Sequence, residues 1–350
     1  MAVVKALSLW FLKKRRDLPW RKDHDPYRIW VSEIMLQQTQ VATVIDYYER
    51  FLKRFPTLSS LAESTEQEVL TLWSGLGYYR RAKNLRLGAQ YLITKGGHIP
   101  KTRSEILEVP GIGPYTAGAI LSIAFDLPEA LVDGNVQRVF ARYFGIKSPI
   151  QTSIAQKLFW EKASEWVKKA RSPRVHNQAL MELGALICHK GMPLCDQCPI
   201  SKNCVAFEKG LQKKLPVSKP RKQTLELHWV GIIFHQKKTQ GPDLYFVKQN
   251  LNTPWWEGLW DFPSIEKPLS NSWETAPQLL HAKIGQELLL KPLNHVQHSV
   301  THHNIRIAPF LINTKKELLG IKGKWLSLPA IAELPLSSLA KKIFRQLPLW

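Results

Sequence analysis

Two acidic residues of this 350-residue chain stand in settings that could support acid–base chemistry. Glu33 lies in a segment predicted as helix, with Trp30 one turn before it and Gln37 one turn after it. A carboxyl group in such a setting is either a solvated residue on the helix face, which is the commoner case, or a group whose pKa is raised in a pocket. Asp133 precedes Asn135 at the end of an apolar stretch, where it could equally be a helix N-cap.

All four cysteines lie in one window with the spacing C-x6-C-x2-C-x5-C. They are Cys188, Cys195, Cys198 and Cys204. Four thiolates in a short loop indicate a metal centre, and tetrahedral sulfur ligation suits zinc or an iron–sulfur cluster. Zinc sites usually pair their ligands as two C-x2-C knuckles, but only the middle pair has this spacing, which favours a [4Fe–4S] cluster. We expect the cluster to fix the shape of the loop and not to take part in bond cleavage.

A Pro-Gly-x-Gly turn lies between two segments predicted as helices. Pro110 ends the first helix, Gly111 and Gly113 allow a tight hairpin with positive φ, and Pro114 suits the first turn of the next helix. The unpaired N–H groups at that helix start favour an anion such as a DNA phosphate. On this motif alone an ordinary helix–helix turn is an equally good interpretation. The following small, apolar helix is expected to be buried and leads to Asp133.

The charge balance favours a polyanionic partner. The chain has 49 Lys and Arg against 28 Asp and Glu, a formal net charge of +21. Nucleic acid is the simplest such partner, with an anionic membrane surface as the alternative. No apolar run approaches the roughly 20 residues of a spanning helix. The basic segment 1–16 lacks a small-residue cleavage site, so we interpret it as a first helix and expect a cytoplasmic, nucleoid-associated monomer.

The chain is expected to form two domains of different class. Residues 1–208 show helical patterning, with a helix predicted to begin at Asp25-Pro26 and another at a Thr65-x-x-Glu68 capping box. Residues 209–224 are basic, contain proline and lack apolar periodicity, so we interpret them as a linker. Residues 225–350 contain β-rich runs, and their expected α+β class is what the family resemblance given below implies.

Several motifs together resemble adenine DNA glycosylases of the MutY family, within the helix-hairpin-helix glycosylase superfamily. They are Pro19-Trp20-Arg21, Trp30-x-Ser32-Glu33-x-Met35-Leu36-Gln37-Gln38-Thr39, Gly75-Leu76-Gly77-Tyr78-Tyr79 and Val132-Asp133-Gly134-Asn135. The cysteine spacing is similar to that of the cluster loop of this branch. The resemblance implies an all-α glycosylase domain followed by a Nudix-like domain, and it overrides the solvated-face interpretation of Glu33.

The resemblance also implies roles for individual residues. Glu33 would protonate the adenine of a flipped-out nucleotide, Asp133 would stay ionised beside the sugar cation, and Tyr115 and Asn135 would position Asp133 and the sugar. Trp20, Arg21, Trp30 and Gln178 would line the base pocket. The expected DNA contacts are Gln37, Gln38, Thr39, Tyr78, Gly111, Gly113, Thr301 and His302. A basic set, Arg80, Arg81, Lys83 and Arg86, is expected to face phosphates.

The residue at position 115 bears on the reaction type. The bifunctional relatives that also cut the backbone carry a lysine there, and tyrosine cannot form a Schiff base. We therefore expect a monofunctional enzyme that removes adenine opposite 8-oxoguanine or guanine in double-stranded DNA. The alternatives are a glycosylase of the same fold acting on thymine mispairs or oxidised pyrimidines, and a DNA-binding module without catalysis.

The C-terminal domain is expected to read the lesion. The segment 264–290 has only scattered acids, and not the glutamate-rich helix with which a pyrophosphatase would hold divalent metals. Val300-Thr301-His302 resembles the family's Phe-Ser-His recognition turn, with valine and threonine as departures. On local sequence alone a polar β-turn is an equally good interpretation.

Overall fold

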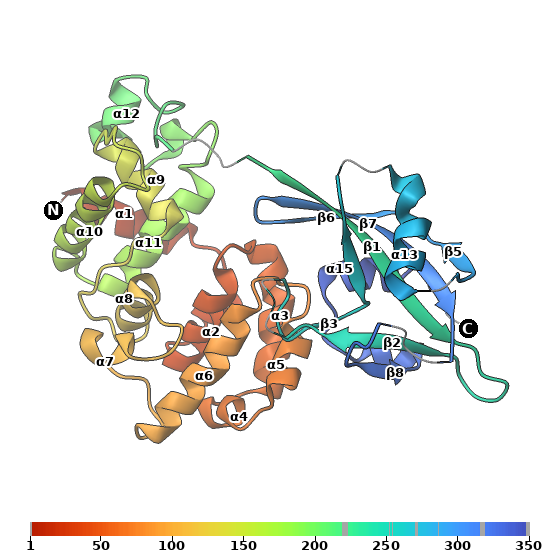
Figure 1. The fold of residues 1–350 in the computed structure, drawn as a ribbon. Coiled ribbons are helices and arrows are strands. Elements are labelled where there is room, and N and C mark those ends of the chain that lie inside the picture. Colours follow the sequence, from red (N-terminus) through yellow and green to blue (C-terminus); the bar gives the residue numbers. More distant parts are fainter. Residues whose placement is uncertain are drawn as a thin grey trace. The chain divides into compact units, whose positions relative to one another are not determined.

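The computed structural model describes residues 2–218, 223–251, 253, 255–269, 272–285, 287–315 and 319–347. The chain divides into two compact units (Figure 1). Unit 1 consists of Met1–Ser64 and Arg80–Pro220, and unit 2 consists of Thr65–Tyr79 and Arg221–Trp350. Among the described residues, no helix has the length and apolar character needed to cross a bilayer.

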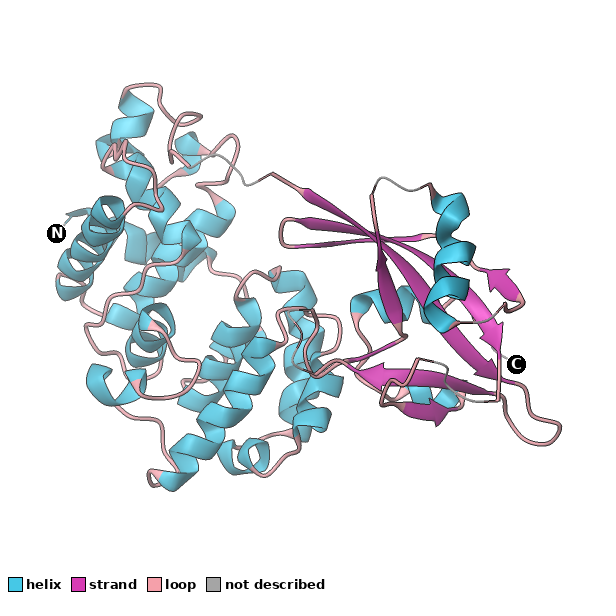
Figure 2. Ribbon diagram, in the orientation of Figure 1, coloured by secondary structure: helices cyan, strands magenta, loops and turns pink. Residues whose placement is uncertain are grey.

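Unit 1 is helical, as predicted (Figure 2). Its α-helices are α1 (Ala2–Lys14), α2 (Pro26–Leu36), α3 (Val41–Arg54), α4 (Leu58–Ala62), α6 (Arg80–Thr94), α7 (Arg103–Leu107), α8 (Pro114–Ile123), α9 (Gly134–Tyr143), α10 (Ser153–Lys168), α11 (Pro173–Leu186) and α12 (Val205–Glu208). Short 3-10 helices lie at η1 (Pro19–Arg21), η2 (Cys195–Gln197) and η3 (Ser201–Asn203).

The predicted helix starts are confirmed. Asp25 is the N-cap of α2 and accepts hydrogen bonds from the backbone N–H groups of Tyr27 and Arg28, with proline in the first turn. Thr65 and Glu68 form a reciprocal capping box at the start of α5 (Glu66–Trp73), which belongs to unit 2. These side chains satisfy N–H groups that have no partner within the helix.

Helix α8 is the buried centre of unit 1. Every residue from Thr116 to Ile123 is buried, and the helix packs against α2, α7 and α11. At Gly118 a Cβ would lie 2.0 Å from the carbonyl oxygen of Ala130, so only glycine permits this approach of the chain. The close contact holds the segment before Asp133 directly against α8.

Unit 2 combines α5 with a mixed sheet and flanking helices, which confirms the predicted α+β class. The strands are β1 (Leu225–Gln236), β2 (Leu244–Gln249), β3 (Trp260–Asp261), β4 (Ser264–Lys267), β5 (Leu290–Pro292), β6 (Val296–Val300), β7 (His303–Asn313) and β8 (Lys324–Leu326). The other helices are η4 (Trp273–Thr275), α13 (Ala276–Ile284), α14 (Leu328–Ala332) and α15 (Ser338–Phe344). The order is β3-β2-β1-β7-β5, with β1 and β7 parallel.

Alternate residues of β1 enter two apolar clusters on opposite faces of the sheet. Ile232 and Phe234 join the cluster that contains Leu280 of α13. Ile233 joins the cluster that contains Leu339 of α15 and Ile331 of α14. Because neighbouring strand residues point to opposite faces, β1 is buried on both sides.

The predicted linker lies only partly within the described residues. Its first half packs onto unit 1: Leu215 is buried, its carbonyl accepts a 2.9 Å hydrogen bond from Arg142, and the carbonyl of Val217 accepts one from the N–H of Ile150. Residues 219–222 lie outside the described part of the chain. The domain limits at 208 and 225 therefore stay a prediction.

Candidate active site and cysteine pocket

Glu33 lies at the centre of the helical unit and not on a solvated helix face. It stands on α2 with only 5% of its surface exposed. The hydroxyl of Tyr115, at the start of α8, donates a hydrogen bond of 2.5 Å to Glu33 Oε2. The sulfur of Met181 lies 3.4 Å from the same hydroxyl. Three segments distant in sequence, α2, α8 and α11, thus meet at one carboxyl group.

The environment of Glu33 favours its protonated form near neutral pH. Burial is the main cause that raises its pKa, from 4.5 to about 7, and the nearby charge of Asp133 acts in the same direction. The hydrogen bond from Tyr115 and the charge of Arg21 act in the opposite direction but are outweighed. A carboxylic acid of this kind can donate a proton at physiological pH.

Asp133 occupies a more polar setting at the N-terminus of α9. Burial raises its pKa, while hydrogen bonds from the backbone N–H of Val136 (2.7 Å) and the amide of Asn135 (2.8 Å) oppose the rise. The helix dipole also favours the anion at this N-cap position. The N-cap interpretation of Asp133 is therefore confirmed, and it is compatible with a second role as a stabilising carboxylate.

Asn135 connects this carboxylate to the cysteine loop through a residue not identified from the sequence, Arg138. The guanidinium of Arg138 donates to Asn135 Oδ1 (2.8 Å) and to the carbonyls of Gly184 (2.7 Å) and Cys188 (2.6 Å). An arginine one turn inside the helix after Asp133 gave no distinctive signal in the sequence, because two of its partners, Gly184 and Cys188, lie 46 and 50 residues further along the chain.

The expected base-pocket residues lie in the same unit, but the structure assigns Arg21 a definite partner. Trp20 is buried and packs edge-on against Tyr48, and Trp30 is fully buried. Gln178 is 9% exposed and donates to the carbonyl of Arg174. Arg21 forms a two-pronged ion pair with Glu182, with distances of 3.1 and 2.9 Å. Contacts of these side chains with a base stay a prediction.

Glu182 is held by ion pairs with Arg16 and Arg21. Burial would raise its pKa, but hydrogen bonds from Arg16 and Arg21 lower the pKa to about 2. Unit 1 therefore contains two buried glutamates with opposite shifts. Glu182 stays ionised between two guanidinium groups, whereas Glu33 has only a hydroxyl as its direct partner.

The turn after α2 and the hairpin before α8 supply the expected DNA-contact residues of unit 1. Gln37 donates to Thr116 Oγ1 (3.3 Å), and Gln38 adopts a left-handed backbone with φ of 57°. Gly111 has φ of 84°, but Gly113 has φ of −96°, so the expectation of positive φ is wrong for Gly113. Nothing lies within 4 Å of a Cβ placed on Gly113, which leaves its backbone open to an approaching group.

Two of the four basic residues expected to face phosphates point inward instead. Arg81 donates to backbone carbonyls at the end of α2, and Arg86 donates to the carbonyl of Ser64 (2.5 Å). The i, i+1, i+3 and i+6 spacing of these basic residues does not reveal which side chains turn towards the rest of the fold.

Two expected contact residues of unit 2 have unusual backbones. Tyr78 is 49% exposed with φ of 49°. Thr301, with φ of 53°, and His302 form the two-residue loop between β6 and β7, in which Val300 pairs with His303. The ring of His302 lies 4.1 Å from that of His303, measured between centroids. The polar-turn interpretation is confirmed, while lesion reading stays a prediction.

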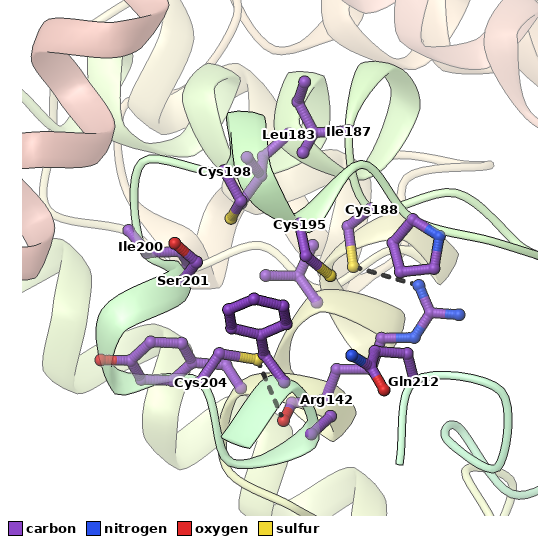
Figure 3. A pocket seen from close by; sticks show the side chains of 15 residues that line it. Arg142, Leu183, Ile187, Cys188, Cys195, Cys198, Ile200, Ser201, Cys204 and Gln212 are labelled. Carbon is purple, nitrogen blue, oxygen red and sulfur yellow. Dashed lines mark hydrogen bonds between the residues drawn. The ribbon is translucent and has the colours of Figure 1, made fainter. Parts of the chain in front are cut away.

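The four cysteines line one pocket (Figure 3). They come from the end of α11, from η2 and from the segments that flank η3. Arg142 Nη1 donates to Cys188 Sγ (3.3 Å) and to the carbonyl of His189 (2.6 Å). Burial raises the pKa of Cys198 to about 12, and the other three cysteines add to the rise. Free thiolates are therefore unfavourable here without a positive centre among them.

The comparisons with known proteins cover both units. The sequence matches the HhH-GPD superfamily of base excision DNA repair proteins over residues 31–165 and the NUDIX domain over residues 230–346. Adenine DNA glycosylase of Rattus norvegicus is 34% identical, with 97% of this chain and 76% of the relative covered. The same protein of Buchnera aphidicola from Schizaphis graminum is 34% identical, with 88% and 86% covered.

A solved structure matches more than half of the chain. A thermostable thymine-DNA glycosylase aligns with a TM-score of 0.54 and 33% identity, over 59% of this chain and 95% of its own. The sequence relatives cover more of the chain, 97% and 88% of it. The pair of acids Glu33 and Asp133, the hairpin before α8 and these matches together show that the chain belongs to the family of adenine DNA glycosylases, hydrolases of base excision repair.

Proposed function

We propose that this protein is a monofunctional glycosylase that removes adenine opposite 8-oxoguanine or guanine in double-stranded DNA. The observation that carries the proposal is the pair of acids in unit 1, in which Glu33 has a pKa of about 7 and Asp133 is held by two hydrogen-bond donors. Burial raises the pKa of both groups, but hydrogen bonds from Val136 and Asn135 oppose the rise at Asp133. Such a difference in surroundings lets two carboxyl groups divide the roles of acid and stabilising anion.

In the proposed reaction the adenine nucleotide is first turned out of the duplex. The carboxylic proton of Glu33 passes to a ring nitrogen of the adenine. The N-glycosidic bond then breaks, and its electron pair leaves with the base. The ionised Asp133 stabilises the resulting oxocarbenium charge on the sugar. Water adds to the anomeric carbon, and the proton it loses restores the acid.

Tyr115 supports a reaction without backbone cleavage. Burial raises the pKa of its hydroxyl well above the usual value, so the group stays a donor to Glu33. It holds the carboxyl group in one orientation but cannot attack the sugar as a lysine amine could. The expected product is an abasic site that breaks only on treatment with alkali.

We further propose that Cys188, Cys195, Cys198 and Cys204 hold a [4Fe–4S] cluster. All four line the pocket, and among the described residues no group of three or more His, Cys, Asp or Glu side chains is placed to hold a single metal ion. The C-x6-C-x2-C-x5-C spacing, with a single C-x2-C pair, favours a cluster of several atoms over one zinc ion. When bound, the cluster would supply a rigid centre for the loop, whose Lys190 and Lys202 can face phosphates.

The expected DNA contacts extend this proposal to both units. In unit 1 they are Gln37, Gln38, Thr39, Gly111 and Gly113. In unit 2, Tyr78 would insert beside the mispair, and Thr301 with His302 would read 8-oxoguanine. The support comes from three of them, Gln38, Tyr78 and Thr301, since exposed non-glycine residues with positive φ are costly and often mark functional sites. The cytoplasmic, nucleoid-associated location and the monomeric state accompany this proposal as predictions.

The test is single-turnover excision on four duplexes, with A opposite 8-oxoguanine, A opposite G, T opposite G, and A opposite T. Wild type and Glu33→Gln are compared, each with and without alkali. The proposal requires breaks only after alkali, only in the first two duplexes and only with wild type. Cutting of the thymine mispair would instead support the activity named for the structural relative, the thymine-DNA glycosylase. Full activity of Glu33→Gln would refute the mechanism.

A further inference from the structure

The C-terminal end of α2 needs hydrogen-bond donors from outside the helix. The helix stops at Leu36, and the backbone of Gln38 then turns into the left-handed region with φ of 57°. The last carbonyls of a helix have no N–H partner four residues later, and a cation near them is favoured by the helix dipole. A side chain that donates to these carbonyls therefore stabilises the turn that follows.

The guanidinium of Arg81, on the first turn of α6, occupies them. Its Nη1 atom donates to the carbonyls of Ile34 (2.8 Å), Met35 (3.0 Å) and Gln37 (2.5 Å). Its Nη2 atom donates to Thr39 Oγ1 at 3.3 Å. One side chain thus bonds to the end of α2 and to the residues on either side of Gln38, so it can hold the turn in one conformation.

The same turn is joined to the acid pair. The carbonyl of Gln37 is one of the acceptors of Arg81, and the side chain of Gln37 donates to Thr116 Oγ1. Thr116 follows Tyr115, whose hydroxyl donates to Glu33 on the preceding turn of α2. The turn and Glu33 are thus anchored by separate hydrogen bonds to two neighbouring residues of α8, Thr116 and Tyr115.

We propose that Arg81 is a positioning residue for base extrusion. It holds Gln37–Thr39 in the conformation that meets the mispaired duplex, while Glu33 is held separately by Tyr115. The inference rests on the proposed function, because it gives Arg81 a part in bringing the adenine to Glu33. It also means that Arg81 does not have the phosphate-binding role predicted from the run of basic residues.

Arg80 provides a matched control on the adjacent position. It carries the same charge and is exposed, whereas Arg81 is partly buried against α2. If charge near the DNA is what matters, Arg80→Gln and Arg81→Gln should have similar effects. If the hydrogen bonds to the turn matter, Arg81→Gln should slow extrusion at saturating DNA, whereas Arg80→Gln, which removes an expected phosphate contact, should change mainly the salt dependence of duplex affinity.

The experiment measures three quantities for wild type, Arg80→Gln, Arg81→Gln and Arg81→Lys. They are the single-turnover excision rate at saturating DNA, the salt dependence of duplex affinity, and the fluorescence rise of 2-aminopurine placed next to the adenine. For Arg81→Gln we expect the excision rate and the fluorescence rise to slow together by about 10-fold or more. Its salt dependence should stay that of wild type. Arg81→Lys keeps one donor group and should recover part of the rate.

Distinct results would overturn the inference. An unchanged saturating rate with a log–log salt slope smaller by about one unit would make Arg81 a phosphate contact. A lower melting temperature with an unchanged saturating rate would leave it a purely structural residue. If Arg81→Gln does not fold, Arg81→Lys decides between these cases, since it keeps the charge but loses the forked geometry. Failure of wild type to excise adenine would refute the proposed function, and the fluorescence rise would still test Arg81.

Discussion

Replacing Glu33 by glutamine should change how the stability of the protein depends on pH. The pKa of Glu33 is 4.5 in an unfolded chain and about 7 in the folded protein, so the folded state binds the extra proton between these values. Stability from this group is fully present below pH 4.5 and is lost as pH rises through 7. Glutamine is neutral throughout and can still accept the hydrogen bond from Tyr115.

The size of the effect follows from the shift. The difference of about 2.5 pKa units corresponds to roughly 3 kcal/mol, of which roughly 2.5 kcal/mol is lost between pH 5 and pH 8. The free energy of unfolding of Glu33→Gln, relative to wild type, should therefore rise by that amount between pH 5 and pH 8. The sign of this change is informative, because for a solvated glutamate the stability difference between the variant and wild type would not change between pH 5 and pH 8.

The assay is urea unfolding at pH 5 and pH 8, followed by far-ultraviolet circular dichroism, which reports mainly the helical unit. Glu182→Gln is the control: the pKa of Glu182 is lowered to about 2, so that residue is ionised at both pH values in either state. Its substitution should destabilise the protein by the same amount at pH 5 and pH 8. A difference between Glu33→Gln and wild type that stays constant within about 0.5 kcal/mol would refute the reasoning.

Four further predictions concern the same two units. Tyr115→Phe removes a hydrogen bond that lowers the pKa of Glu33, so the alkaline limb of the single-turnover pH–rate profile should move to higher pH. An unmoved limb would contradict the assignment of Glu33 as the general acid. Gly111→Ala should lower the free energy of unfolding by more than about 1 kcal/mol, because φ is 84° and the Cβ would lie 2.7 Å from that of Asn84. Gly113→Ala, with open space around it, is the tolerated control in the same urea titration. Cys198→Ser should lose bound iron and the absorbance at roughly 400 nm that is expected of a thiolate-ligated cluster. Wild-type protein that is colourless and contains stoichiometric zinc would refute the cluster. Thr301→Gly should relieve the cost of φ at 53° for a β-branched residue, roughly 1 kcal/mol, and so raise the melting temperature. The excision rates opposite 8-oxoguanine and opposite guanine should become more alike in this variant. An unchanged ratio of the two rates would show that Thr301 does not read the lesion.

The position of Arg81 shows why charge patterns mislead about DNA contacts. From the sequence, the four basic residues at the start of α6 form one group. In the structure, Arg81 and Arg86 donate to backbone carbonyls, and Arg80 stays exposed. A helix presents neighbouring residues to different sides, and which side faces another helix depends on packing that lies outside the local sequence.

The sequence by itself determined the features that depend on local chemistry. Caps at Asp25, Thr65 and Asp133 were predictable, because a short polar side chain next to a helical pattern satisfies the first N–H groups. The grouping of the four cysteines, the buried apolar α8 and the change from helical to β-rich patterning were predictable for the same reason. The family resemblance then supplied the roles expected of Glu33 and Asp133.

Only the tertiary structure decided the properties of the site. Glu33 and Asp133 are 100 residues apart, and the raised pKa of Glu33 arises from burial where α2, α8 and α11 meet. The partners of Arg21, Arg81 and Arg138 are likewise distant in sequence. A side chain's exposure and hydrogen-bond partners depend on which segments pack around it, and local residue patterns do not contain that information.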